Sequence, residues 1–495
     1  MTAVLFLSNL KNKVYGEFDM MKMFKLKAVG NGKNTQINEN TPLLMIAGPI
    51  FFEMFLGIML NNIDTLMLSH YDENAVGAVG NANQIMFMLN ILFSVIATAT
   101  GVVVAQYLGA GEKKKMNMIY SLAVIFNAVL GVVLSIGVVF ARPLFMDILN
   151  ISPEMRSHAS TYILIVGGGS FLMAVYNVLI QILRCNGFPK VGMYISVAIN
   201  VINIGGNYLF LYGGLKELNM GVAGVAISTF AARTMAVIAA IAFFYITKTG
   251  RISLRYLKPF PADMLLKMVK IGLPSAGENL SYTLYQMVLL SFVNLMGNES
   301  VNARVYCNSL ISFGMIFSNA SAMATQIITG HLVGAGKEDA AYKRVFRTLG
   351  TSMPITIALA TINRLICPVT LKLFTENENI IRLGCTIMLV DIFVEIGRCL
   401  NMTFVSSLKA AGAYIFPLLA GLVSMWGIGL TCGYFWGVAS GIGVAGIYMG
   451  TAADECIRGL VVMYYWARKK WYGKAVLDNR KPVVKKDSRH SSVLA

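Results

Sequence analysis

The chain has 495 residues, of which 56% are hydrophobic and only 13% are charged, and its formal net charge is +17. A soluble protein carries about 25% charged residues, so this composition excludes an ordinary soluble enzyme of several domains. Apolar runs of about 20 residues or more, such as 43–67 and 122–141, predict instead helices that cross a lipid bilayer.

Both ends of the chain are basic. Residues 1–40 contain six Lys and three acids, and residues 468–495 contain nine Lys or Arg and two Asp, so the two tails hold ten of the 17 net charges. Basic segments beside membrane helices attract anionic lipid. This distribution predicts two cytoplasmic tails and no nucleic-acid partner. Met, Phe and Leu alternate with Lys over 20–28, which predicts a short interfacial amphipathic helix.

Between the tails, hydropathy predicts twelve spans in two groups of six. The first group comprises 43–69, 77–108, 116–141, 157–183, 189–213 and 219–247. The second group comprises 264–296, 301–334, 344–374, 379–410, 413–436 and 440–467. The predicted fold is an all-α integral membrane protein with twelve transmembrane helices in two pseudo-symmetric six-helix bundles.

Alternate loops differ in their basic residues. One set contains fourteen Lys and Arg, among them Lys113, Arg184 and Lys409, and the other set contains five. The basic tails belong to the richer set. The positive-inside rule therefore predicts a multi-pass protein of the inner (plasma) membrane with both termini in the cytoplasm.

Cysteine and histidine do not indicate a metal centre. The seven Cys fall mostly inside apolar stretches without CxxC spacing, and the four His are scattered. No Walker A motif occurs, so hydrolysis of ATP by this chain is not expected. The sequence thus predicts neither a cofactor nor a fixed metal.

The two groups of spans are an internal duplication with a constant offset in residue number. Pro49 and Glu53 correspond to Pro274 and Glu278. At the same offset, Asn83 matches Asn308, Gly109-Ala-Gly111 matches Gly334-Ala-Gly336, and Leu183 and Gly187 match Leu408 and Gly412. Towards the ends of the halves the offset is slightly shorter, and there Gly221-Val-Ala-Gly224 matches Gly443-Val-Ala-Gly446.

Two halves of six spans enter the membrane in the same orientation and are therefore parallel repeats, a transporter architecture. The predicted domains are a basic segment (1–40), an N-terminal lobe (41–247), a cytoplasmic linker (248–263), a C-terminal lobe (264–467) and a basic tail (468–495). In such proteins the site lies between the halves near the midplane, and access alternates by rocking.

Several motifs resemble a known family over residues 40–467. The stretch from Pro49 to Gly111 contains Asp64-Thr-Leu-Met-Leu-Ser-His-Tyr71 and Gln106-Tyr-Leu-Gly-Ala-Gly-Glu112. It resembles the first two helices of multidrug and toxic compound extrusion (MATE) transporters. The motifs Ile271-Gly-Leu-Pro274 with Glu278-Asn279, and Glu395-x-x-Arg398-x-x-Asn401 before Leu408-Lys-Ala-Ala-Gly412, are similar to one bacterial branch.

The resemblance implies an antiporter that exports an organic cation while a proton or a sodium ion enters. Proton-coupled relatives carry an Asn and an Asp one turn apart in helix 5, where this chain has Asn203 and Asn207. Sodium-coupled relatives place acids in helices 7 and 10, where this chain has Glu278, Asp391 and Glu395. The resemblance leaves Na⁺ and H⁺ both open as coupling ion, with Na⁺ expected near Glu278 and Asp391.

The acids inside the spans are the candidates for cation and substrate binding, because a carboxylate at bilayer depth is costly and usually faces the interior. Glu53 and Glu278 each follow a Pro by four residues, and the missing N–H frees a carbonyl beside the acid. A protonated Glu that only packs there is the structural alternative.

On the tenth span, Glu395 and Arg398 share one helix face, and Asp391 lies one turn earlier. A purely structural ion pair is as good an explanation as function. Asp64 ends the first span with Asn61 and Asn62 nearby, so it either binds a cation in the N-terminal half or simply lies at the outer interface.

Asn200, Asn203 and Asn207 form a polar stripe, which in membranes is often interhelical hydrogen bonding. Tyr282 offers an aromatic face to an organic cation, although packing is the commoner role of such a residue. For Arg233, Asp454, Glu455 and Arg458 we expect mutual salt bridges.

The sequence as a whole predicts a monomeric secondary active exporter of cationic or amphiphilic small molecules. The acids at 53, 278, 391 and 395 outnumber Arg233 and Arg398, which favours a cationic substrate. The first alternative is a flippase of a lipid-linked saccharide, and it would need several unpaired Arg or Lys. A membrane-embedded enzyme is the second, but His is nearly absent from the spans.

Overall fold

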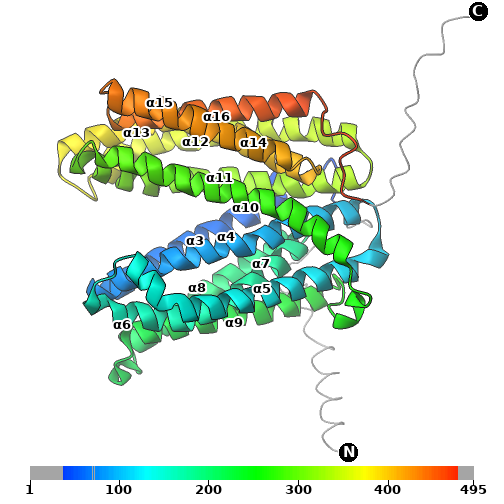
Figure 1. The fold of residues 1–495 in the computed structure, drawn as a ribbon, viewed down its shortest axis with the longest axis horizontal. Coiled ribbons are helices and arrows are strands. Elements are labelled where there is room, and N and C mark those ends of the chain that lie inside the picture. The colour runs from blue at the N-terminus through cyan, green and yellow to red at the C-terminus, as the bar shows by residue number, and fades with distance from the viewer. Residues whose placement is uncertain (1–36, 70, 72, 478–495) are drawn as a thin grey trace, which may run out of the picture.

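The computed structural model describes residues 37–69, 71 and 73–477, which form long helices without any strand (Figure 1). The N-terminal lobe contains α3 (Leu43–Ser69), α4 (Glu73–Gly109), α5 (Lys113–Ile148), α6 (Pro153–Tyr162), α7 (Ser170–Cys185), α8 (Pro189–Leu211) and α9 (Gly221–Ile246). The C-terminal lobe contains α10 (Ala262–Asn294), α11 (Asn298–Gly334), α12 (Glu338–Leu371), α13 (Glu378–Ala410), α14 (Ile415–Val423), α15 (Leu430–Tyr434) and α16 (Val444–Ala467).

These helices correspond to the twelve predicted spans. The fourth span is α6 and α7, joined through a π-helical turn over Ile163–Gly167 with a bend of 41°. The eleventh is α14 and α15, interrupted by the π-helical turn Ser424–Gly429 and followed by a second one, Phe435–Ala439. π-Helical turns are inserted mostly as single widened turns within α-helices, so each pair serves as one span.

Eight helices of the described chain are long and apolar enough to cross a membrane on composition alone, and the bent pair makes nine. The three further long helices, α10, α13 and α16, are more polar. Two of them carry the densest groups of buried charge, since α13 contains Asp391, Glu395 and Arg398, and α16 contains Asp454 and Glu455 with Arg458. The polar character of these helices is therefore the first structural indication of a site.

The lobes meet through α3 and α4 of one and α10 and α11 of the other. In the duplication α3 corresponds to α10 and α4 to α11, so the contact of α3 with α11 is the counterpart of the contact of α10 with α4. Across the first of these contacts, Phe51 and Phe55 face Phe317 and Phe313 with ring centroids 6.4 and 5.9 Å apart.

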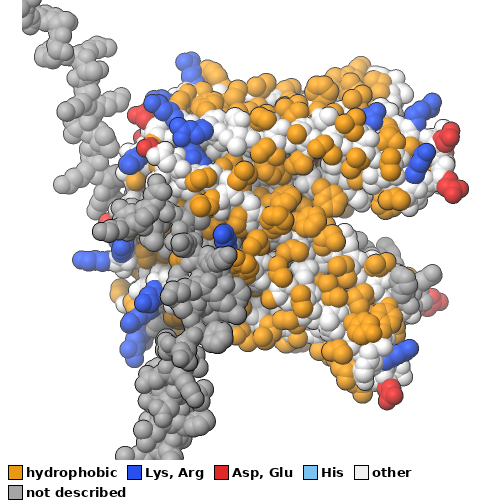
Figure 2. All heavy atoms as spheres, turned by 180° about the vertical axis from the view of Figure 1, so that it is seen from behind, with side chains coloured by type: hydrophobic (Ala, Val, Ile, Leu, Met, Phe, Trp, Pro, Cys, Tyr) orange, Lys and Arg blue, Asp and Glu red, His pale blue; other side chains and the backbone are white. Residues whose placement is uncertain are grey.

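We call the end of the molecule that holds residues 248–263 the linker end. The lobes come together there and separate towards the opposite end, where Figure 2 shows a notch between them. Apolar side chains cover much of the outer surface of both lobes in the same view, as expected of helices that face lipid (Figure 2).

The described parts of both chain termini also lie at the linker end. Lys469 Nζ is 2.8 Å from Asp339 Oδ1 at the start of α12, and the backbone N of Val476 donates to Gln106 Oε1 of α4. Arg344 donates to the carbonyl of Glu39. Residues 1–36, with the amphipathic helix expected over 20–28, and residues 478–495 lie outside the described part of the chain.

Candidate functional site

The N-terminal lobe encloses a cavity of about 420 Å³, which we call the N-lobe cavity. It lies between α3, α4, α7, α8 and α9, and Ile316 of α11 closes one side. Its polar lining residues are Glu53, Asn61, Asn90, Tyr176, Ser196, Asn200 and Arg233. The rest of its lining is mainly apolar, a mixture typical of sites for small organic molecules.

Glu53 is held in this cavity by an ion pair. Arg184 Nη2 of α7 lies 2.6 Å from Glu53 Oε2, and both side chains are about 10% exposed. Tyr176 donates a long hydrogen bond of 3.5 Å to the other carboxylate oxygen. Gly192 of α8 packs so closely against the carboxylate that an added Cβ would overlap Glu53 Oε2. The pair therefore depends on a glycine in a third helix.

Gly192→Ala is expected to push the Glu53 carboxylate away from Arg184 and to destabilise the protein by about 1–3 kcal/mol, the usual cost of overpacking. Thermal unfolding of the purified protein in detergent measures the loss. Gly205→Ala on the same helix is the control, because a Cβ there meets no atom within 4 Å. Equal melting temperatures for the two variants would contradict the packing of Gly192 on the pair.

A second polar group lies near the other end of α3. Asn207 Nδ2 donates to Asp64 Oδ1 at 2.6 Å and to Asn203 Oδ1 at 3.1 Å. Asn203 Nδ2 in turn donates to Thr229 Oγ1 of α9 at 3.1 Å. The expected interhelical hydrogen bonding is thus present for these two asparagines. Asn200 differs, because it bonds the Ser196 carbonyl of its own helix and lines the N-lobe cavity.

The C-terminal lobe contains two smaller cavities, and Tyr282 lines both. The linker-side cavity, of about 230 Å³, has the charged lining residues Glu278, Lys409, Glu455 and Arg458. The distal cavity, of about 240 Å³, has the charged lining residues Arg304, Asp391 and Arg398. Glu278 and Asp391, near which a sodium ion is expected, therefore line different cavities.

Glu278 forms an ion pair that repeats the pair of Glu53. Lys409 Nζ of α13 lies 2.7 Å from Glu278 Oε2. The offset that relates Glu53 to Glu278 in the duplication also relates Arg184 to Lys409. The prediction that Arg184 and Lys409 lie in loops is wrong, because both are in the last turns of helices and are largely buried.

Asp391 and Glu395 have different surroundings although they lie one turn apart on α13. Glu395 pairs with Arg398, as their spacing predicts. Asp391 is 2% exposed, forms no salt bridge with any described residue, and has no hydrogen-bond partner at Oδ1. Arg304 of α11 lines the same cavity but donates to Gln286 of α10 instead.

On α16, Arg458 Nη2 lies 3.2 Å from Asp454 Oδ2 and 2.9 Å from Glu455 Oε1. Asn401 of α13 donates to the second oxygen of Glu455. The expected salt bridges are therefore present for these three residues. Arg233 makes none with a described residue, so the predicted salt bridge of Arg233 is wrong.

The numbers of acids and cations that line the three cavities differ from those predicted from the sequence. The four acids are Glu53, Glu278, Asp391 and Glu455, whereas the five cations are Arg233, Arg304, Arg398, Lys409 and Arg458. The expectation that acids outnumber cations is thus incorrect, because it omits Arg304, Lys409 and Arg458. The described residues contain no group of three His, Cys, Asp or Glu that could hold a metal ion.

At the linker end, α4 and α11 cross in close contact between the lobes. Gln106 Nε2 of α4 donates to the Ala410 carbonyl at 2.6 Å, and His331 Nε2 of α11 donates to the Cys185 carbonyl at 2.9 Å. The duplication relates Gln106 to His331 and Cys185 to Ala410, so the two hydrogen bonds are equivalent under the repeat. They join the lobes symmetrically on the side opposite to the notch of Figure 2.

The molecule has two six-helix lobes with charged side chains in their cavities, and the lobes meet at one end and separate at the other. This architecture defines a membrane transporter of the two-lobed class. The profile of the MatE family matches residues 49–209 and again 274–435, so the two matches begin at the equivalent residues Pro49 and Pro274. The chain belongs to the MATE family and is a multi-pass membrane transporter, not an enzyme.

Individual relatives agree with this assignment. The chain is 34% identical over 434 residues to Uncharacterized transporter YisQ of Bacillus subtilis, covering 88% of this chain and 95% of the relative. It is 23% identical to a probable multidrug resistance protein NorM of Thermotoga maritima, covering 89% and 94% of the two chains.

Solved structures show the same fold. An outward-facing multidrug resistance MATE family transporter superposes with a TM-score of 0.81 at 19% identity, over 87% of this chain and 96% of that one. A Pyrococcus furiosus transporter, whose reverse polarity of binding pocket is said to suggest a different function, gives a TM-score of 0.80 at 19% identity, with the same coverage.

Proposed function

We propose that the protein is a secondary active antiporter that exports amphiphilic small molecules, cationic ones among them, in exchange for Na⁺ or H⁺. It acts as a monomer in the inner (plasma) membrane, with the linker end and both termini in the cytoplasm. Export follows from alternating access, in which the lobes rock about the α3, α4, α10 and α11 contacts.

Asp391 carries the proposal of ion coupling. Apart from the exposed acids in the first turns of α10 and α13, the acids on α10, α13 and α16 are Glu278, Asp391, Glu395, Asp454 and Glu455. Among the described residues, each of these five except Asp391 has a cationic partner. A buried carboxylate without a partner is stable only when it is protonated or binds a cation. Asp391 lines the distal cavity, where an entering ion can reach it.

Asp64 offers a second place for the coupling ion, in the N-terminal lobe. With Asn203, Asn207 and Thr229 it brings together carboxylate, amide and hydroxyl oxygens, the ligand type that hard cations prefer. Asn207 Oδ1 is buried and has no hydrogen-bond partner. This group favours Na⁺ over H⁺, because it contains one titratable acid among several neutral oxygens.

The N-lobe cavity is the proposed main substrate site. Its lining is mainly apolar, Glu53 in it is paired, and Arg233 has no salt bridge with a described residue. This lining suits an amphiphile with little net charge better than a strongly charged cation. The flippase of a lipid-linked saccharide remains the second candidate. Arg233 and Arg304 favour it, since both line cavities and neither has a carboxylate partner among the described residues.

Asp391→Asn is expected to lower ion-driven efflux about 5- to 150-fold, the range over which ligand coupling usually acts, because the variant cannot exchange its charge for an ion. The measurement is efflux of a fluorescent amphiphilic cation from vesicles, with the Na⁺ and H⁺ gradients collapsed separately. Asp147→Asn, at an exposed acid paired with Arg156, is the control.

Unchanged efflux by Asp391→Asn would refute the role of that acid. Efflux that survives the loss of both gradients would refute ion coupling. If the vesicles instead move a lipid-linked saccharide across the bilayer and leave the cation in place, the flippase is the correct function.

A further inference from the structure

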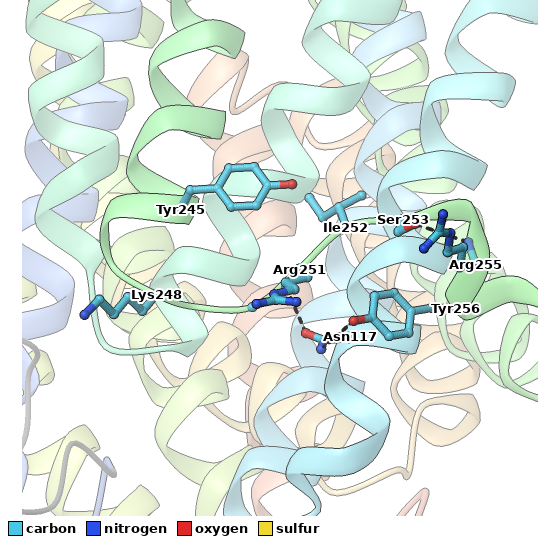
Figure 3. Close-up of a pocket in the computed structure, with 9 residues that line it drawn as sticks. Asn117, Tyr245, Lys248, Arg251, Ile252, Ser253, Arg255 and Tyr256 are labelled. Atoms are coloured by element: carbon cyan, nitrogen blue, oxygen red, sulfur yellow. Dashed lines mark hydrogen bonds between the residues drawn. The ribbon is translucent and has the colours of Figure 1, made fainter. Parts of the chain in front are cut away.

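A cavity of about 800 Å³ lies at the linker end, outside the interiors of the lobes. The end of α9, the loop that follows it and the start of α5 enclose it (Figure 3). Neither the proposed coupling ion nor the proposed substrate site involves its residues. What it can bind must therefore be inferred from its own chemistry.

The charge of this cavity is entirely positive. Lys248, Arg251 and Arg255 line it, and no acid does. All three cations are exposed, and none forms a salt bridge with a residue of the described chain. Three cations that line one cavity without counter-charge give it a positive potential, which stabilises a bound anion. Arg in particular matches the oxygens of a phosphate with two parallel hydrogen bonds.

The backbone that carries these cations is fixed by hydrogen bonds to α5. The backbone N of Arg251 donates to Asn117 Oδ1 at 2.9 Å, and the backbone N of Ser253 donates to Ser121 Oγ at 3.0 Å. Asn117 also donates to the hydroxyl of Tyr256, which Figure 3 places beside Arg251. These hydrogen bonds fix the loop as one side of the cavity. The Tyr256 hydroxyl lies on the same side as the cations.

Large exposed apolar side chains occur in the same segment as the cations: Tyr245 lines the cavity, Leu254 directly precedes Arg255, and Phe260 follows five residues after it. Tyr245 is 49% exposed, Leu254 66% and Phe260 57%. Tyr prefers the level of the lipid headgroups, and exposed apolar residues beside it suit the upper part of the acyl chains. A soluble phosphate would make no use of these three side chains, whereas a phospholipid uses both parts of the surface.

We propose that this cavity binds the phosphate headgroup of an anionic phospholipid of the inner leaflet. Arg251 and Arg255 hold the phosphate oxygens, Lys248 adds charge, and Tyr256 donates a hydrogen bond. The acyl chains lie along Tyr245, Leu254 and Phe260. Because the loop is part of the linker between the lobes, the lipid is attached where the two lobes are joined.

The test uses the full-length protein in detergent and native mass spectrometry of lipid adducts. Dioleoyl phosphatidylglycerol, dioleoyl phosphatidylcholine and the soluble sn-glycerol 3-phosphate are titrated separately. Each basic residue near an anionic surface contributes about a fivefold factor in affinity, so Lys248→Gln with Arg251→Gln and Arg255→Gln should weaken phosphatidylglycerol binding about a hundredfold. Phosphatidylcholine binding should not change.

A matched triple variant removes the same charge elsewhere at the linker end. Lys337→Gln, Lys343→Gln and Arg347→Gln lie on or just before α12, are exposed, and do not line the cavity. This control should keep its phosphatidylglycerol affinity, and circular dichroism should show both triple variants folded.

Equal losses in the two variants would mean general charge attraction, and no loss in either would mean no site; both results overturn the proposal. Tight binding of sn-glycerol 3-phosphate, lost with the first triple variant, would assign the cavity to a soluble phosphate instead of a lipid. None of these outcomes depends on efflux, so failure here is separate from failure of the proposed antiport.

Discussion

Arg458→Leu is expected to lower the free energy of unfolding by about 3–5 kcal/mol, because it leaves two buried acids, Asp454 and Glu455, without their cation. Arg458 is 3% exposed and the acids are 0% and 2% exposed, so water cannot replace the lost partner. Unfolding of the purified protein in mixed micelles with increasing SDS measures the difference.

The same pair of acids provides the test of this explanation. Adding Asp454→Asn and Glu455→Gln to Arg458→Leu removes the uncompensated charge, so the triple variant should recover most of the lost stability. Arg468→Leu, an exposed residue just after the same helix, should change stability by no more than about 0.5 kcal/mol. A triple variant as unstable as Arg458→Leu would show that arginine packing, and not charge, is the cause.

Hydropathy and duplication are strong signals in this chain, and they suffice for the architecture. Long apolar runs such as that of α5 can only be satisfied in a bilayer as helices, and Pro49 and Pro274 with their following acids fix the register of the halves. The pairing of Glu395 with Arg398 and of Arg458 with its neighbours is also local, because it depends on helical spacing alone.

The partners of Glu53 and Glu278, by contrast, cannot be predicted from helical spacing. Arg184 is 131 residues from Glu53 in the sequence, and it ends an apolar run, so local composition assigns it to a loop. The duplication nevertheless contains a usable signal. The offset that relates the two acids also relates Arg184 to Lys409, so a cation occurs at equivalent places in both halves. Arg304 has no such counterpart, since position 79 is Val, and only the packing of α11 on α10 reveals its position.

The crossing of α4 and α11 also follows the internal duplication. It explains why glycine occurs at the equivalent positions 109 and 334. A Cβ at Gly109 would overlap the His331 carbonyl oxygen, and a Cβ at Gly334 would overlap the Gln106 carbonyl oxygen. Gly330 similarly faces Ala105, since a Cβ added at Gly330 would lie 2.7 Å from the Cβ of Ala105. Closure of the linker end thus requires glycine at both equivalent positions.

Gly109→Ala and Gly334→Ala together are therefore expected to keep the lobes apart at the linker end and to lower efflux about tenfold or more, since alternating access needs both ends to close in turn. Each lobe should stay folded, because Ala is the better helix former and the overlap is between lobes. Double electron–electron resonance between spin labels at Lys114 and Lys343 measures the separation.

Gly350→Ala on α12 is the matched control, because a Cβ there meets no atom within 4 Å, and its label distances and efflux should equal those of the unsubstituted protein. The double variant should show a longer distance between Lys114 and Lys343 with an unchanged circular dichroism spectrum. Lost efflux without a longer distance would place the defect elsewhere than in closure. Normal efflux would mean that the lobes need not come as close as the crossing of α4 and α11 requires.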